Sequence, residues 1–109
     1  MDKRIGKIQR ASFGSGGYQD ACIGVSWVLG SDNGWGVHDF WGTWGVERSD
    51  YCKWTEADRI QQLGEMVMRL NAILKAAKVE KVEDLKGTPI EVTFEGMVMK
   101  EWRVLTEAI

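Results

Sequence analysis

The chain has 109 residues, of which 44% are hydrophobic and 28% charged, and its net charge is −2. This length corresponds to a single domain, residues 1–109, with enough apolar side chains to bury a core. The slight acidic excess excludes the broadly basic surface that nucleic acids require. The cluster of Lys3, Arg4, Lys7 and Arg10 near the N-terminus is more simply explained as solvated strand charges.

The two cysteines, Cys22 and Cys52, lack CxxC spacing and have no cluster of histidines near them. A zinc site is therefore not predicted, and we expect no other metal or cofactor. The residues after Met1 form no apolar signal segment, and no run of 18 apolar residues could span a membrane. We expect a protein of the reducing cytoplasm, with both thiols free and no membrane association.

The first half of the chain predicts three strands. Residues 5–13 form a first candidate, and Ser15-Gly16-Gly17 marks a turn. Residues 21–29 alternate strictly between the two faces of a strand. The pair Asn33-Gly34 favours a tight turn, so residues 35–44 are expected to return as the second strand of a hairpin.

The second half predicts a long amphipathic helix at 56–78, followed by two strands. Thr55 is a good N-cap, and Asp58 three residues later forms a near capping box. The expected buried stripe, which Met66 and Ile73 widen, follows 3–4 spacing: Ile60, Leu63, Val67, Leu70 and Leu74. A short helical turn at 82–86 precedes strands at 89–95 and 97–106. The predicted fold is α+β, an antiparallel five-stranded sheet (β-β-β-α-β-β) packed on one long amphipathic helix.

The segment 34–44 is the strongest functional signal, because it contains three of the six tryptophans. The rings can form a rigid aromatic core, or they can form a contact surface, where tryptophan is favoured. For the second possibility the candidate binding residues come from this segment and from the preceding turn: Trp35, His38, Asp39, Trp41, Trp44, Tyr18 and Asp20.

Catalytic constellations are poorly supported, so the sequence does not predict an enzyme. His38 and Asp39 are neighbours in a strand and would point to opposite faces, which disfavours an acid–base dyad. No serine has a GxSxG setting, and the glycine-rich stretch 14–17 lacks the Lys-Ser/Thr ending of a P-loop. Asp20, Asp32 and Asp50 are more simply turn residues than ligands of a metal.

Several segments together resemble a family of small proteins of tailed bacteriophages and prophages. They are residues 16–21 (GGYQDA), 34–37 (GWGV), 39–42 (DFWG), 53–59 (KWTEADR), 89–96 (PIEVTFEG) and 102–107 (WRVLTE). The resemblance covers most of the chain and implies a setting, the cytoplasm of the bacterial host. It implies no catalytic residues.

The sequence thus leads to two hypotheses about function. The first is a non-enzymatic phage accessory protein that binds a host or phage protein, with a host antidefence inhibitor as one form of it. The alternative is a small-ligand or nucleotide-binding protein, in which aromatic rings stack on bases and glycine-rich strand ends admit phosphates. A homodimer is a further hypothesis, because an exposed last strand can pair with the same strand of a second copy.

Overall fold

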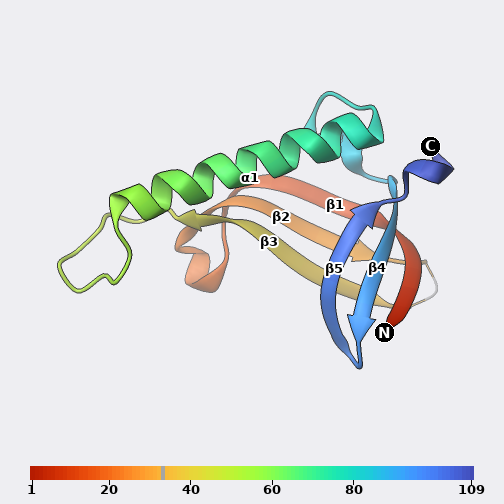
Figure 1. Cartoon of the computed structure of the whole chain (residues 1–109), viewed down its shortest axis with the longest axis horizontal. Helices are drawn as coiled ribbons and strands as arrows, with labels where there is room; N and C mark the ends of the chain where they lie inside the picture. The colour runs from red at the N-terminus through yellow and green to blue at the C-terminus, as the bar shows by residue number, and fades with distance from the viewer. Residues whose placement is uncertain (33) are drawn as a thin grey trace.

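The structure is a computed structural model that describes residues 1–32 and 34–109. It consists of β1 (Asp2–Gly16), β2 (Cys22–Gly30), β3 (Gly36–Trp44), the 22-residue helix α1 (Glu56–Ala77), β4 (Pro89–Glu95) and β5 (Val98–Val104). Three short 3₁₀ helices complete it: η1 (Tyr18–Asp20), η2 (Val82–Leu85) and η3 (Thr106–Ala108) (Figure 1). The predicted α+β fold and its element order are confirmed. The predicted turn at Asn33 lies outside the described residues.

All five strands belong to one antiparallel sheet in the order β3-β2-β1-β4-β5. The predicted hairpin of β2 and β3 is confirmed, and its register places Trp27 opposite Asp39 and Val25 opposite Trp41. The long strand β1 pairs with β4 through its first part and with β2 through the rest. Strands β3 and β5 are therefore the two ends of the sheet.

Strand β1 is longer than the predicted 5–13 and carries a bulge between Ile8 and Arg10. The bulge shifts the alternation by one residue, which explains why the sequence pattern of this strand is poor. The backbone at Gly6 lies very close to the Trp35 ring, since a Cβ atom on Gly6 would be 2.7 Å from Cζ2 of Trp35. A glycine at this position lets the Trp35 ring pack directly on the backbone of β1.

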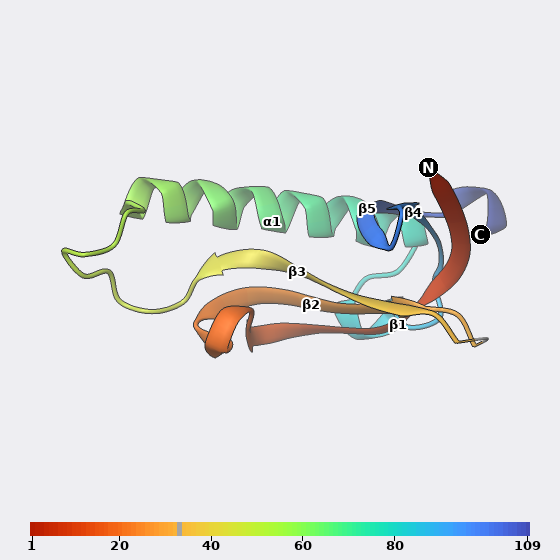
Figure 2. The same cartoon turned by 90° about the horizontal axis from the view of Figure 1, so that it is seen from below.

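The sheet is strongly curved, so that side chains of its two end strands come into contact although the two strands are not paired with each other. The β4–β5 hairpin and α1 lie on the same side of the layer formed by β1, β2 and β3 (Figure 2). The Trp102 indole of β5 donates a hydrogen bond to Asp39 of β3 across 2.9 Å. The chain thus forms one antiparallel sheet with a single long helix between its third and fourth strands.

Helix α1 begins at the predicted capping box. The Asp58 backbone N–H donates to Thr55 Oγ1 (3.1 Å), and the Thr55 backbone N–H donates to Asp58 Oδ2 (2.8 Å). The helix ends at Ala77, one residue before the predicted end, where Lys78 adopts a left-handed conformation with φ 60°. A local sequence signal therefore determines the start of this helix, whereas its end has a lysine at the left-handed position where glycine or asparagine is usual.

The predicted buried stripe of α1 is wrong in part. Ile60 and Val67 are 68% and 54% exposed, whereas Met66, which was predicted to widen the stripe, is buried, as is Ala77. Two overlapping series with 3–4 spacing share Leu63 and Leu70, so the sequence fits either face of the helix. Packing against the tryptophans of the sheet selects the series that contains Met66. No helix in the described part of the chain combines the length and the apolar character needed to cross a bilayer.

Candidate functional site

Three tryptophan rings pack together where β2, β3 and β5 converge. The Trp27 ring centroid lies 4.9 Å from those of Trp41 and Trp102, and the Trp41 and Trp102 rings stack at 5.3 Å with an angle of 19°. Trp27 is fully buried, Trp41 is 7% exposed and Trp102 is half-buried. The cluster thus extends from the core to the surface.

The half-buried Asp39 carboxylate organises the outer two rings. Its Oδ2 accepts hydrogen bonds from the Nε1 atoms of Trp41 (3.0 Å) and Trp102 (2.9 Å), and its Oδ1 accepts one from the Phe40 backbone N–H (2.8 Å). Both carboxylate oxygens are therefore engaged, and the two end strands of the sheet are joined through one side chain. Because an ionised carboxylate is a strong acceptor, these bonds fix the orientation of both indoles.

Arg69 of α1 lies over the exposed part of this cluster. Its guanidinium carbon is 3.9 Å from the centroid of the Trp41 ring, a distance typical of a cation–π contact. Among the described residues, no hydrogen bond or ion pair engages the Arg69 guanidinium. Its five N–H donors are consequently available to a ligand.

Two adjoining hollows meet at Arg69, and we call them together the α1–β5 groove. One, of about 430 Å³, lies between β3 and β5, and the other, of about 350 Å³, lies between α1 and β5. They share Trp41, Arg69 and Trp102. The remaining lining residues are Asp39, Phe40, Met99, Lys100, Glu101, Ala72, Ile73, Ala76, Arg103 and Val104.

The structure distributes the predicted binding residues over several places. Asp39 and Trp41 belong to the α1–β5 groove, but Trp41 is a core residue, and only a small part of its ring can touch a partner. Trp35 directly precedes β3, where it is half-buried and edge-on to Phe94 with the ring centroids 5.7 Å apart. Trp35 lines neither hollow of the α1–β5 groove.

Trp44 and Asp20 line a different hollow, of about 310 Å³, near the beginning of α1. The Trp44 ring stacks on Trp54 with centroids 6.4 Å apart, and the Arg59 guanidinium carbon lies 4.4 Å from the centroid of Trp54. Tyr18 in the neighbouring η1 is 73% exposed. This end of the molecule brings together residues from the turn and from the end of β3.

His38 is exposed, and it alternates along β3 with Asp39 and Trp41, whose face is the one next to α1. It therefore lies on the outer face of the β2–β3 hairpin. A shallow hollow of about 360 Å³ on this face is lined by residues that include Gly17, Ser26, His38 and Phe40. His38 and Asp39 point to opposite faces, as predicted from their positions in one strand.

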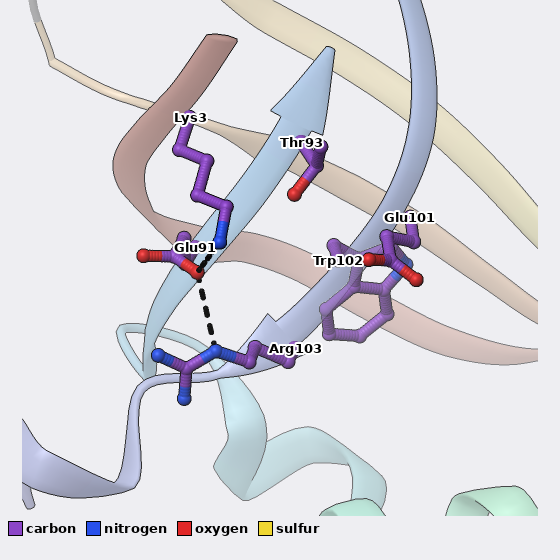
Figure 3. A pocket seen from close by; sticks show the side chains of 6 residues that line it. All are labelled: Lys3, Glu91, Thr93, Glu101, Trp102 and Arg103. Atoms are coloured by element: carbon purple, nitrogen blue, oxygen red, sulfur yellow. Dashed lines mark hydrogen bonds and ion pairs between the residues drawn. The ribbon is translucent and has the colours of Figure 1, made fainter. Parts of the chain in front are cut away.

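A smaller hollow, of about 160 Å³, lies on the β4–β5 hairpin (Figure 3). Three of its charged residues are paired with one another, since Glu91 contacts Lys3 Nζ at 3.9 Å and Arg103 Nε at 3.2 Å. Arg103 also forms a bidentate pair with Glu107 (2.9 and 3.0 Å), which lowers the pKa of Glu107 to about 2. These charges hold the C-terminal segment and are less available to a ligand.

Sequence reasoning missed two principal residues of the α1–β5 groove, Arg69 and Trp102. Arg69 looks like an ordinary solvent-facing helix residue, although its position three residues after Met66 places it at the border of the buried face. Trp102 alternates with Val104 in the last strand, which indicates a core-facing side chain but not its contact with β3.

Within the described residues, no group of three or more His, Cys, Asp and Glu side chains is placed to hold a metal ion, and Cys22 and Cys52 are free thiols. Comparison of the chain with protein-family models, curated proteins and solved structures gave no match. The resemblance to tailed-phage proteins therefore stays a prediction.

Proposed function

We propose that this chain is a non-enzymatic accessory protein of tailed bacteriophages or prophages that acts in the bacterial cytoplasm by binding a host or phage protein. The α1–β5 groove is its contact surface. Inhibition of a host defence protein is one form that such binding takes. Of the pair considered for acid–base chemistry, Asp39 accepts hydrogen bonds from the Trp41 and Trp102 indoles and, within the described residues, none from His38; this arrangement fits binding better than catalysis.

The observation that carries the proposal is the Arg69 guanidinium stacked on Trp41 beside the half-buried ring of Trp102. Tryptophan and arginine are the residues most enriched at binding hot spots, particularly beside hollows that a partner side chain can fill. Asp39 holds both indoles in fixed orientations, so a partner meets a preorganised surface and loses little free energy in ordering it.

Capture of partners from bacterial host lysate tests this proposal. The wild-type chain is compared with Arg69→Gln, which removes the guanidinium from the groove, and with Arg10→Gln as a matched control. Arg10 is an exposed arginine of β1, outside the hollows described above. Loss of a charged hydrogen bond costs about 1.5–3 kcal/mol, so Arg69→Gln should lower the captured amount about tenfold or more.

The two arginine variants separate a specific contact from general charge. Equal capture by wild type and Arg10→Gln, with loss in Arg69→Gln, supports the proposal. Equal capture by all three chains, or no specific capture by any of them, overturns the assignment of this surface. Circular dichroism and thermal unfolding of each variant establish that the fold is retained.

A second candidate function, binding of a small ligand or nucleotide, is favoured by the shallow hollow on the outer face of β2–β3. Exposed aromatic rings on such a sheet face can stack on bases. Phe40 and His38 offer ring surfaces there, and Gly17 leaves backbone groups accessible. The net charge of −2 favours a small ligand over a long polyanion.

Native mass spectrometry of the protein purified from bacterial cells, followed by thermal shift with a nucleotide panel, tests this candidate. A co-purifying small molecule, or a stabilising shift that is lost in Phe40→Ala and kept in Arg69→Gln, supports it. No bound mass and no shift with any nucleotide would rule it out.

A further inference from the structure

We infer that the occupant of the α1–β5 groove is an extended peptide segment that carries an acidic side chain and adds along the free edge of β5. The inference rests on the proposed function, because it names the kind of partner that the groove receives. It is carried by three features: an open sheet edge, an aromatic floor, and an arginine that has no carboxylate partner among the described residues.

The sheet supplies the open edge. Strand β5 pairs only with β4, and β3 pairs only with β2, so each end strand has one side that no strand in the described chain occupies. The larger hollow of the groove is lined by residues 39–41 of β3 and residues 99–102 of β5. Backbone N–H and C=O groups on a free strand edge are ready partners for an added extended peptide.

The floor of the groove suits the side chains of such a peptide. Alternate side chains of a strand point to the same face, so every second side chain of the peptide would face the Trp41 and Trp102 rings. The hollow continues between β5 and α1, where Ala72, Ile73 and Ala76 provide apolar walls. A segment with apolar or aromatic residues at alternate positions therefore fits this surface.

The charges around the groove favour an acidic residue in that segment. Lys100 pairs with Glu95 (3.3 Å), and Arg103 pairs with Glu91 and Glu107, whereas the Arg69 guanidinium has no carboxylate partner in the described chain. Asp39 is not paired with Arg69 in the described chain: its oxygens accept instead from the Trp41 and Trp102 indoles and from the Phe40 backbone N–H. A carboxylate from the partner can form the bidentate pair that arginine favours.

A long polyanion fits the groove less well than a single carboxylate. Glu101 lines the same hollow and is exposed, and no ion pair within the described residues neutralises it. A single acidic residue of the partner, with uncharged neighbours, can pair with Arg69. Such a segment places no further negative charge next to Glu101, where it would be repelled. The expected partner is therefore a protein segment and not a nucleic acid.

Selection from a display library of random 12-residue peptides tests the inference directly. On the full-length chain we expect enrichment of peptides with one Asp or Glu at a fixed position, flanked by β-branched or aromatic residues in alternation. A synthesised selected peptide should bind about tenfold more weakly to Arg69→Gln, and Arg10→Gln should leave its affinity unchanged. Replacing its acidic residue by the amide, or N-methylating the backbone that faces β5, should weaken binding to a similar extent.

The position of binding is read from amide chemical shifts, which should change in residues 99–102 and along α1 near Arg69. Enriched peptides without an acidic position, affinity that is insensitive to Arg69→Gln or to N-methylation, or shift changes confined to the outer face of β2–β3 would each overturn the inference. If lysate capture depends on Arg69 but the peptide selection fails, the inference of an extended acidic peptide is rejected and the proposed function is retained. If both experiments fail, the inference and the proposed function are both rejected.

Discussion

The two groups of stacked tryptophans in this molecule are built from the same residue type but have different surroundings. Trp27, Trp41 and Trp102 pack with ring centroids 4.9–5.3 Å apart, and two of their indole N–H groups donate to Asp39. Trp44 and Trp54 stack at a wider 6.4 Å, half-buried, beside the first turn of α1. The first group joins β3 and β5, the two end strands of the sheet. The second group lies beside the N-terminal turn of α1.

The difference shows that the number of tryptophans in a segment does not determine what they do. Buried area and hydrogen bonding make the first group part of the core, while its outer edge, with Arg69, is open to a partner. The second group has Arg59 over one ring, and Arg59 also pairs with Glu56 (2.9 Å). An arginine stacked on tryptophan is thus available to a ligand in one group and already paired in the other.

The largest effect is expected from truncating the centre of the first group. Trp27→Ala should lower the free energy of unfolding by about 3–5 kcal/mol, because it leaves a cavity against two other rings. Trp54→Ala should cost only about 1–2 kcal/mol, because its ring is half-exposed and loses one stacking partner. Urea unfolding followed by circular dichroism measures both values. If both variants lost the same free energy of unfolding, the two tryptophan groups would contribute equally to stability, and the distinction between them would be wrong.

The second prediction concerns the carboxylate that distinguishes the two groups. Asp39→Ala should lower the free energy of unfolding by about 2–3 kcal/mol, because two indole N–H groups and one backbone N–H lose their acceptor. Asp39→Asn keeps one oxygen acceptor and should cost about 1 kcal/mol. Asp32→Ala, which removes only an exposed ion pair with Lys7, is the control and should change stability by less than about 1 kcal/mol. A loss in Asp39→Ala no larger than in this control would mean that the carboxylate does not hold the end strands together.

Most of the fold could be predicted from the sequence, because its signals are local. Strict alternation located β2, and the capping box of Thr55 and Asp58 located the start of α1. The bulge after Ile8 hid the length of β1, and the choice between two faces of α1 depended on the sheet that it packs against. Each of these misses arises where tertiary packing overrides a short-range pattern.

The candidate site was less predictable, because it forms between distant parts of the chain. Asp39 and Trp102 are 63 positions apart, and they meet only because the curved sheet brings β3 and β5 together. The sequence drew attention to Asp39 and Trp41 through the density of tryptophans in their segment. It could not indicate that their partners would be Trp102 from the last strand and Arg69 from the helix.

The third prediction separates the role of Arg69 in binding from a role in stability. A cation–π contact at an exposed site contributes about 0.5–1 kcal/mol, so Arg69→Gln should lower the free energy of unfolding by no more than this. Arg59→Gln should cost at least as much, because Arg59 also loses its pair with Glu56. Thermal and urea unfolding of the two variants give this order. If Arg69→Gln were by far the more destabilised, a loss of partner capture in that variant would reflect unfolding rather than a missing contact.

The smallest effect is expected at the C-terminal ion pairs, which are remote from both tryptophan groups. The Arg103 guanidinium lowers the pKa of Glu107 to about 2 from the ordinary value of 4.5. The stabilising contribution of this pair is therefore fully present above about pH 4.5 and is lost as the pH falls towards 2. Carbon-13 NMR titration of the Glu107 carboxyl should give a midpoint near 2 in the wild-type chain and a midpoint closer to 4.5 in Arg103→Gln.

Lys100→Gln is the matched control for that titration, because it removes a cation of the same strand that pairs with Glu95 instead of Glu107. The Glu107 midpoint should stay near 2 in this variant. A midpoint that rises equally in Lys100→Gln and Arg103→Gln would mean that the general positive charge of β5, and not the bidentate contact, lowers the pKa. In that case the charge on β5 would also contribute to attraction of an acidic segment into the α1–β5 groove, and the loss of affinity expected for Arg69→Gln would be smaller.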